Sequence, residues 1–357
     1  MLWIYRKMKF FNKSFLCLLC SVLFFSKTFA EDFQRFSVIP FLAYSEETEI
    51  QYGILGLIFF KPFSESQNIS SVDLLLQGTT KNQYMLRTKP DFFFLKDKIH
   101  LPMEFSISRW QTFLFERGAN GDFESYDDFL QTSFCFQIPL EMNFFIPETI
   151  PFRYGILTKG EIRKNNLNEN SVAKELHDGL ILGGGYKFLF DNRDNRNWPL
   201  FGYYFAFEEI FYGGDFKFHT ESLDIRFYLP IIFNTTLTLA GLFEQSLGSA
   251  PLGYLAGADG ISRFRGVDSH VWNDTRALIY QIEFRKKLFW RLAGVIFTEF
   301  LQTGNKFSNL FENEFHYSVG FGGRLALNKK EALYARGDIS LIDGKHLGLT
   351  INIREAF

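Results

Sequence analysis

Two arginines stand in a glycine-rich stretch of the chain, in the run Arg263-Phe264-Arg265-Gly266-Val267. A strand pattern follows at Leu278–Arg285, with Glu283 and other polar residues on one side and apolar residues on the other. A guanidinium group makes strong paired hydrogen bonds to a carboxylate. The stretch therefore predicts a loop that folds back into a polar cavity, where Arg265 pairs with a carboxylate of the wall. A solvated surface loop is the alternative interpretation.

Motifs for other kinds of chemistry are missing from the sequence. It contains no nucleophile elbow, no zinc-binding helix motif and no phosphate loop. Gly183-Gly184-Gly185 lies in a strand pattern and precedes no Lys-Ser/Thr pair, so it favours strand bending. The six histidines are scattered without metal-ligand spacing. We therefore expect no catalytic residue, no metal and no cofactor, in a protein that is not an enzyme.

The elements that must position Arg265 are strands. Apolar and polar residues alternate with a period of two over nearly the whole chain from Phe36 onward. The clearest runs are Leu101–Ile107, Phe134–Phe144, Leu223–Leu229 and Leu347–Ile353. A soluble β-sandwich would turn the apolar face inward, whereas a membrane barrel turns it outward to lipid and keeps a polar lumen.

Strand length and aromatic content distinguish these two architectures. The runs Phe134–Phe144 and Gly344–Phe357 reach the roughly 9–11 residues that a tilted membrane strand needs. The chain holds 46 Phe, which fits the aromatic girdles of a barrel at both membrane interfaces. Charged residues stand within strand patterns, where a wet lumen would solvate them. The sequence thus predicts an all-β fold, a transmembrane antiparallel β-barrel.

The connections between the strand patterns alternate in length. Short turns are predicted at Lys286–Trp290 and Leu327–Glu331. Longer polar connections are predicted at Glu116–Asp128, Lys164–Asp178, Ser246–Thr275 and Gln302–Glu312. We expect one rim of long loops and one rim of tight turns, as in bacterial barrels.

The N-terminus has the pattern of a signal peptide over residues 1–30. Four basic residues precede the apolar run Phe15–Phe25, and Thr28-Phe29-Ala30 is an acceptable cleavage site. The mature chain is then a single barrel domain, residues 31–357, in which Cys135 is the one remaining cysteine. A net charge of −2 and the lack of a basic block argue against binding to nucleic acid. We expect a location in the bacterial outer membrane, after cleavage near Ala30.

The last residues of the sequence have the form of an outer-membrane sorting signal. The pattern is polar-x-Gly-x-x-apolar-x-apolar, with a final aromatic residue, and is made by His346, Gly348, Ile351, Ile353 and Phe357. A final strand that lacks a partner could add to the open edge of an assembly machine by β-augmentation. An ordinary last strand is the alternative. Outer-membrane lipid and the assembly machinery are therefore expected partners.

The arginine loop and four other segments, in sequence order, resemble the bacterial surface antigen superfamily, the BamA/TamA-like outer-membrane proteins. Arg265-Gly266-Val267, followed by Gln281-x-Glu283-x-Arg285, resembles the loop motif and the strand after it in that family. The other four segments are Pro40–Gly53, Thr79–Gln83, Asp191–Asn195 with Pro199 and Gly202, and Arg336-x-Asp338 with Glu355-Ala356-Phe357.

This resemblance implies a barrel of about sixteen strands whose arginine loop is inserted in the lumen. It also implies that Arg265 contacts acidic residues of nearby strands, and the candidates are Glu283, Glu299 and Asp338. The sequence departs from the family in two respects. Val267 stands where the family usually has an aromatic residue, and no segment corresponds to the periplasmic POTRA modules.

The function implied by the resemblance is insertion of proteins into the outer membrane or their passage across it. Unfolded barrel proteins or secreted proteins would then be the clients. A weakly paired seam between the first and last strands, Phe36–Ala43 and Gly348–Ile353, would open to template a client strand. Two alternatives stay open at this point: a passive pore or transporter for small solutes, and a structural or adhesive surface barrel.

Overall fold

The computed structural model describes residues 36–45, 49–61, 68–115, 117–121, 126–147, 150–167, 178–269, 271–329 and 332–357. The predicted signal peptide, residues 1–30, lies outside the described residues and stays a prediction. Among the described residues, no helix has both the length and the apolar character needed to span a membrane.

The described chain consists almost entirely of strands. Their bounds are β1 (Phe36–Ser45), β2 (Glu49–Phe60), β3 (Ser70–Thr79), β4 (Tyr84–Phe94), β5 (Ile99–Pro102), β6 (Glu104–Phe115), β7 (Tyr126–Met142), β8 (Phe152–Leu167), β9 (Gly179–Asp191), β10 (Gly202–Gly214), β11 (Phe218–Pro230), β12 (Thr235–Gly248), β13 (Ala256–Gly257), β14 (Asn273–Asp274), β15 (Arg276–Lys287), β16 (Leu292–Gly304), β17 (Phe315–Asn328), β18 (Leu333–Ile342) and β19 (His346–Ile353). Short helical turns lie at η1 (Ile232–Asn234), η2 (Leu252–Tyr254) and α2 (Asn309–Glu312).

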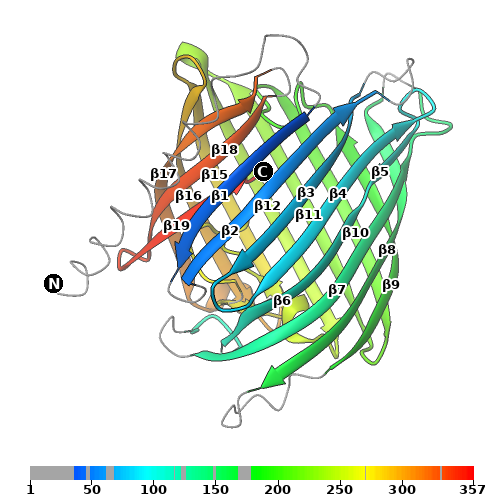
Figure 1. Cartoon of the computed structure of the whole chain (residues 1–357), viewed down its shortest axis with the longest axis vertical. Coiled ribbons are helices and arrows are strands. Elements are labelled where there is room, and N and C mark those ends of the chain that lie inside the picture. The colour runs from blue at the N-terminus through cyan, green and yellow to red at the C-terminus, as the bar shows by residue number, and fades with distance from the viewer. Residues whose placement is uncertain are drawn as a thin grey trace.

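Seventeen of these strands form one large antiparallel sheet, which Figure 1 shows curled into a barrel. Strands that follow one another around the wall pair in sequence order, and β12 pairs with β15 because the segment between them leaves the wall. β5 and β6 are one strand interrupted at Met103, and both pair with β4 and β7. Counted in this way the wall has sixteen strands, which confirms the predicted fold.

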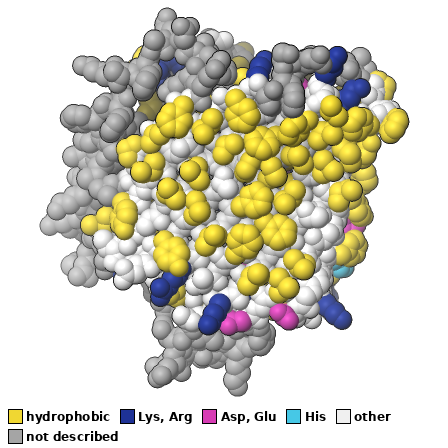
Figure 2. Space-filling view, turned by 45° about the vertical axis from the view of Figure 1, so that its right-hand side comes forward, with side chains coloured by type: hydrophobic (Ala, Val, Ile, Leu, Met, Phe, Trp, Pro, Cys, Tyr) yellow, Lys and Arg dark blue, Asp and Glu magenta, His cyan; other side chains and the backbone are white. Residues whose placement is uncertain are grey.

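The apolar face of the strands points outward, as predicted. On β7, Phe134 is 41% exposed while its neighbour Ser133 is 9% exposed. On β15, Tyr280 and Phe284 are exposed, whereas Glu283 and Arg285 are buried. Figure 2 shows apolar side chains spread over the wall, with charged side chains mostly near its two ends. The barrel therefore offers hydrocarbon to its surroundings and keeps its charges inside.

The chain has long and short connections, but they do not alternate strictly as predicted, because the connection from β10 to β11 (residues 215–217) and the next one, from β11 to β12 (residues 231–234), are both short. The turn between β15 and β16 and the turn between β17 and β18 are short, whereas residues 249–275 form a long excursion between β12 and β15. The predicted Asp/Asn turn lies between β9 and β10. In it, Asp194 Oδ1 accepts backbone amides of Leu200 and Phe201, so side-chain oxygens close the bend as expected.

The last strand is shorter than the sequence pattern predicts. The expected strand Gly344–Phe357 is realised as β19, His346–Ile353. Arg354 has a left-handed backbone with φ of 72°, which ends the extended conformation. Residues 354–357, here called the tail, turn into the lumen, where Ala356 and Phe357 are buried. The prediction that Phe357 ends a wall strand is therefore wrong.

The two strands that bound the sheet are β1 and β19. No backbone ladder joins them among the described residues, although each pairs along its length with its other neighbour. Ile39 of β1 and Ile353 of β19 nevertheless belong to one apolar cluster around Leu57, Phe59 and Leu333. The boundary between β1 and β19 is called the seam below.

Candidate functional site

The long connection between β12 and β15 folds into the barrel and is called the lumen loop (residues 249–275). Its two arms pair through β13 and β14. Its tip is tightened by Asp259, whose Oδ1 accepts the backbone amides of Ile261, Ser262 and Arg263 at 2.8, 2.7 and 2.6 Å. The Gly266 amide also donates to the Gly260 carbonyl at 2.9 Å. The tip is thus a compact turn that presents Arg265 at a fixed position.

Aromatic packing anchors the lumen loop to the wall. Phe264 has no exposed surface, and its ring lies edge-on to Trp272 with 5.5 Å between centroids. Trp272 stacks on His316 at 3.6 Å, and its Nε1 donates to the Gly121 carbonyl. Val267 joins the same cluster together with buried residues of β12, β15 and β16. Phe264, next to Arg265, is thus a buried aromatic residue at the tip of the loop.

Arg265 is fully buried and makes the central contacts of the site. Its backbone amide and Nε both donate to Glu299, at 2.6 Å each. Its Nη1 donates to Glu283 at 2.7 Å and lies 3.5 Å from Asp338. The guanidinium carbon lies 3.5 Å from the centre of the Phe297 ring, on the side of β16 that also carries Glu299. All three predicted carboxylates therefore meet Arg265.

Three further arginines share the same carboxylates. Arg285 Nε donates to Glu283 at 2.5 Å, while Arg324 and Arg336 donate to Asp338 at 2.5 and 3.1 Å. A buried charge is costly unless it is paired and hydrogen-bonded. Each carboxylate here is bound by more than one donor group. The result is a continuous ion-pair network on the inner faces of β15 to β18.

The backbone of the loop tip is also tied to the last strands of the wall. Arg336 Nη2 donates to the Ile261 carbonyl at 2.6 Å, and Gln281 Nε2 donates to the Ser262 carbonyl at 2.8 Å. Ser340 Oγ donates to the Arg265 carbonyl at 3.1 Å, and Thr350 Oγ1 to the Gly260 carbonyl at 3.2 Å. These bonds hold the loop by its main chain as well as by its arginine.

Gly266 and Gly348 let the loop touch the last strand directly. A methyl group placed on Gly348 would clash with the carbonyl oxygen of Gly266. Gly266 has φ of 88°, a conformation that favours glycine, and a methyl group there would clash with Ser340. Gly348, which the sequence places in the sorting pattern, therefore also has a packing role against the lumen loop.

The other residues of the predicted sorting pattern lie in different environments. Ile351 is 45% exposed on the outer face, and His346 begins β19 at the turn. Ile353 packs at the seam, and Phe357 is 5% exposed inside the lumen. The sorting role of this pattern stays a prediction.

Sequence reasoning missed several residues of the network. Arg285 and Glu355 belong to segments that resemble the family, but the resemblance gives neither of them a role, and no sequence motif includes Arg324. Glu355 accepts two hydrogen bonds from Arg324 Nε, at 2.9 and 2.8 Å. Trp198, 1% exposed, lies in the turn between β9 and β10 and faces Arg285 at 5.7 Å. An arginine in register with inward-facing carboxylates is the signal that could have identified Arg285 and Arg324.

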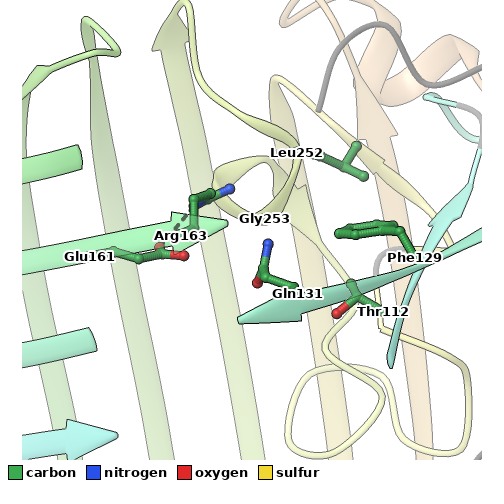
Figure 3. Close-up of a pocket in the computed structure, with 7 residues that line it drawn as sticks. All are labelled: Thr112, Phe129, Gln131, Glu161, Arg163, Leu252 and Gly253. Carbon is green, nitrogen blue, oxygen red and sulfur yellow. Dashed lines mark hydrogen bonds and ion pairs between the residues drawn. The ribbon is translucent and has the colours of Figure 1, made fainter. Parts of the chain in front are cut away.

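Among the described residues, two cavities lie beside the lumen loop, and Gly253 of η2 lines both of them. The first has a volume of about 210 Å³, and Figure 3 shows Glu161 and Arg163 of β8 together with Phe129 and Gln131 of β7 around it. The second has about 240 Å³ and is lined by residues of β8, β10, β11 and β12 and by Arg263. Tyr254 of η2 donates to Glu161 at 3.0 Å. Both cavities have charged walls and are large enough for water or a small polar solute.

One group of side chains has the residue types of a metal site. The potential ligand atoms of Glu209, His219 and Glu221 lie within 4.8 Å of one another. Glu209 accepts a hydrogen bond from Tyr186, and Glu221 accepts one from Gln245 at 2.6 Å. Groups of acidic side chains at the surface are common without an ion, so we assign no metal to this one.

Comparison with known proteins places this geometry in a recognised fold. No protein-family model matches the sequence, and no curated protein matches it. Among solved structures, the chain is similar to BamA from Haemophilus ducreyi lacking POTRA domains 1–3, with a TM-score of 0.56 and 10% identity, over 89% of this chain and 68% of that one. It is also similar to CdiB from Acinetobacter baumannii, with a TM-score of 0.55 and 9% identity, over 88% of this chain and 57% of that one.

At such low identity the likeness is one of fold. It confirms the BamA-like transmembrane barrel that the sequence motifs predicted. The chain spans little more than half the length of CdiB, so the activity of the whole of that protein does not transfer to it directly.

Proposed function

We propose that this chain is a BamA/TamA-like barrel of the bacterial outer membrane that aids the insertion of proteins into that membrane or their passage across it. The observation that carries the proposal is the buried Arg265, which binds the three carboxylates that the family resemblance named. Likeness in fold to BamA and CdiB supports it. The role proposed is assembly or translocation by strand pairing, with no bond-breaking chemistry.

The seam is the proposed place of action. β1 and β19 each have one edge that no described ladder occupies, and an open strand edge is a template for a further strand. Pro40 in β1 has no amide hydrogen to donate, which limits how firmly the first strand can pair. A client strand would add to one of these edges by β-augmentation while the lumen loop keeps the rest of the wall in shape.

Depletion of the protein from its cells tests the assembly role. We expect a specific set of other outer-membrane barrels to fall in abundance, and expression of the wild-type chain should restore them. Quantitative proteomics of isolated outer membranes measures both. If every other barrel keeps its abundance in the depleted cells, the proposed assembly role is wrong.

A pore for small solutes is the second candidate, and the two cavities beside η2 favour it. Both are lined by Gly253 and by charged residues, so together they would form part of a polar path. Planar-bilayer conductance separates the candidates. A steady large current indicates an open pore, whereas a small flickering current is expected from a barrel whose lumen loop is locked by Arg265.

A further inference from the structure

The tail, residues 354–357, occupies a defined site on the inner wall. Its path starts with the Arg354 amide, which donates to the Tyr334 carbonyl at 2.9 Å. Glu355 is bound by Arg324, and the main-chain oxygen of Phe357 accepts a hydrogen bond from Arg285 Nη2 at 2.8 Å. Both arginines are buried to within 1% of full burial. Two arginines of the wall thus hold the tail at points two residues apart.

Charge balance shows what chemistry this site requires. The network contains four arginines and four carboxylates only while the tail is bound: Arg265, Arg285, Arg324 and Arg336 against Glu283, Glu299, Asp338 and Glu355. Without Glu355 the carboxylates number three, and Arg324 Nε loses its acceptor. A buried unpaired charge is strongly unfavourable. The vacated site would therefore attract another carboxylate.

Aromatic side chains give the site a second preference. The Arg285 guanidinium lies 5.7 Å from the ring centres of both Trp198 and Tyr228 and 5.1 Å from that of Phe357. Such distances allow cation–π contacts. Arg285 Nη1 and Arg324 Nη2 also have no hydrogen-bond acceptor among the described residues. The site thus combines spare donors with an aromatic surround that suits an aromatic side chain.

The bound tail also crosses the seam. Arg354 Nη2 lies 2.8 Å from Asp73 Oδ2 on β3, beyond both β1 and β2. This ion pair joins the end of the last strand to the third strand of the wall. It lies near the apolar cluster of Ile39 and Ile353. Release of the tail would remove this ion pair, which connects the two sides of the seam.

We propose that this is a peptide-binding site, filled at rest by the chain's own tail, whose ligand class is a short peptide segment with an acidic residue two positions before an aromatic residue. A client segment of that kind would displace the tail and break the Arg354–Asp73 tie, which frees the seam. The role toward clients rests on the proposed function. The existence of the site rests on Arg285, Arg324 and the tail alone.

Peptide binding to a variant that ends at Ile353 tests the proposal. The probe is a fluorescein-labelled Arg-Glu-Ala-Phe peptide added to the refolded barrel in detergent, with anisotropy as the readout. We expect saturable binding that weakens at least about tenfold when the peptide's Glu is replaced by Gln, because a charge-assisted hydrogen bond is lost. Arg324→Gln in the shortened barrel should weaken binding similarly. Arg226→Gln, on the inner face of β11, is the matched control and should bind normally.

A second variant tests the proposal if the shortened barrel does not fold. Glu355→Gln in the full chain weakens the resident tail, so the labelled peptide should bind this variant more tightly than the wild type. Equal binding of the Glu and Gln peptides, or binding that ignores Arg324→Gln, overturns the proposal. Peptide binding together with unchanged barrel abundance on depletion would refute the assembly role and leave the site intact. Loss of other barrels on depletion, together with no binding of the peptide, would support the assembly role and refute the peptide-binding site.

Discussion

The wall at β7 and β8 and the wall at the seam are held together in different ways. β7 has 17 residues and β8 has 16, and they pair over nearly their whole length. β19 has 8 residues and β1 has 10, and no described ladder joins them. The seam side instead concentrates side-chain contacts: the arginine network, the lumen loop and the tail all attach to β15–β19. Backbone pairing joins β7 to β8, whereas the contacts described across the seam are the Arg354–Asp73 ion pair and the apolar cluster that includes Ile39 and Ile353.

This difference indicates which side of the barrel is able to change. Backbone ladders break only together with the strand, because each bond is part of a cooperative sheet. Ion pairs and single hydrogen bonds can exchange partners one at a time. The seam side therefore combines a fixed resting arrangement with a small number of contacts that a competing strand or peptide could replace.

Loss of Arg265 is the change that we expect to lower the stability of the seam side most. Arg265→Ala leaves Glu283 and Glu299 buried without their shared cation, and breaking a buried ion pair typically costs about 3–5 kcal/mol. We expect a lower melting temperature and loss of heat-resistant mobility on detergent gels.

Arg263→Ala is the matched control for Arg265→Ala. Arg263 pairs with Glu244 but is 43% exposed, so its loss should cost about 1 kcal/mol or less. If Arg265→Ala kept the gel mobility and melting temperature of the wild type, the idea that Arg265 holds the lumen loop in place would be wrong.

A methyl group on Gly348 should have an intermediate effect that is confined to the seam side. Gly348→Ala forces apart the loop backbone and β19, and overpacking of this kind costs about 1–3 kcal/mol. Gly337→Ala on β18 is the control, since a methyl group there meets no atom within 4 Å. Hydrogen exchange should rise in β19 and stay unchanged in β7 and β8. A uniform rise around the wall would show that the two sides are not independent.

Acid should loosen the turn between β18 and β19 by a smaller amount. Burial favours the neutral form of Asp343, but hydrogen bonds from His316 and the Tyr317 amide outweigh it and hold the pKa of Asp343 below its ordinary value. A depressed folded-state pKa contributes stability above the unfolded value of about 3.9, which is lost as pH falls through the folded-state pKa. We expect faster exchange of the Tyr317 amide below about pH 4.

Asp343→Asn is the control for this acid effect. The variant keeps the shape of the side chain and removes the titrating group, so the acid dependence of that amide should disappear. An acid response that persists in Asp343→Asn would show that a group other than Asp343 is responsible.

Periodicity in the sequence was sufficient to predict the wall. Successive side chains of a strand point to opposite faces, so the alternation of apolar and polar residues shows which face each one occupies. Phe134 and Ser133 are one example, and Tyr280 and Glu283 are another. The partners of Arg265 were also predictable, because the family resemblance implies Glu283, Glu299 and Asp338 as candidates. The contact of Arg265 with the Phe297 ring, by contrast, is visible only in the structure.

The tail and Trp198 could not be predicted by the same reasoning. Residues after Ile353 continue an apparent strand pattern, and only the left-handed conformation of Arg354 turns them inward. Trp198 reaches Arg285 from a turn about ninety residues earlier in the chain. Contacts of this kind depend on which distant segments the curled sheet brings together. The alternation of residues along a single strand contains no information about such contacts.

The contact between Gly266 and Gly348 has a consequence for the order of folding. The lumen loop precedes β15–β19 in the chain, yet its tip lies against the backbone of the last strand with no room for a side chain between them. If the barrel closed first, the tip of the lumen loop would have to enter a closed lumen whose inner wall already binds the tail. We therefore expect the lumen loop to dock before the β18–β19 hairpin pairs with the rest of the wall.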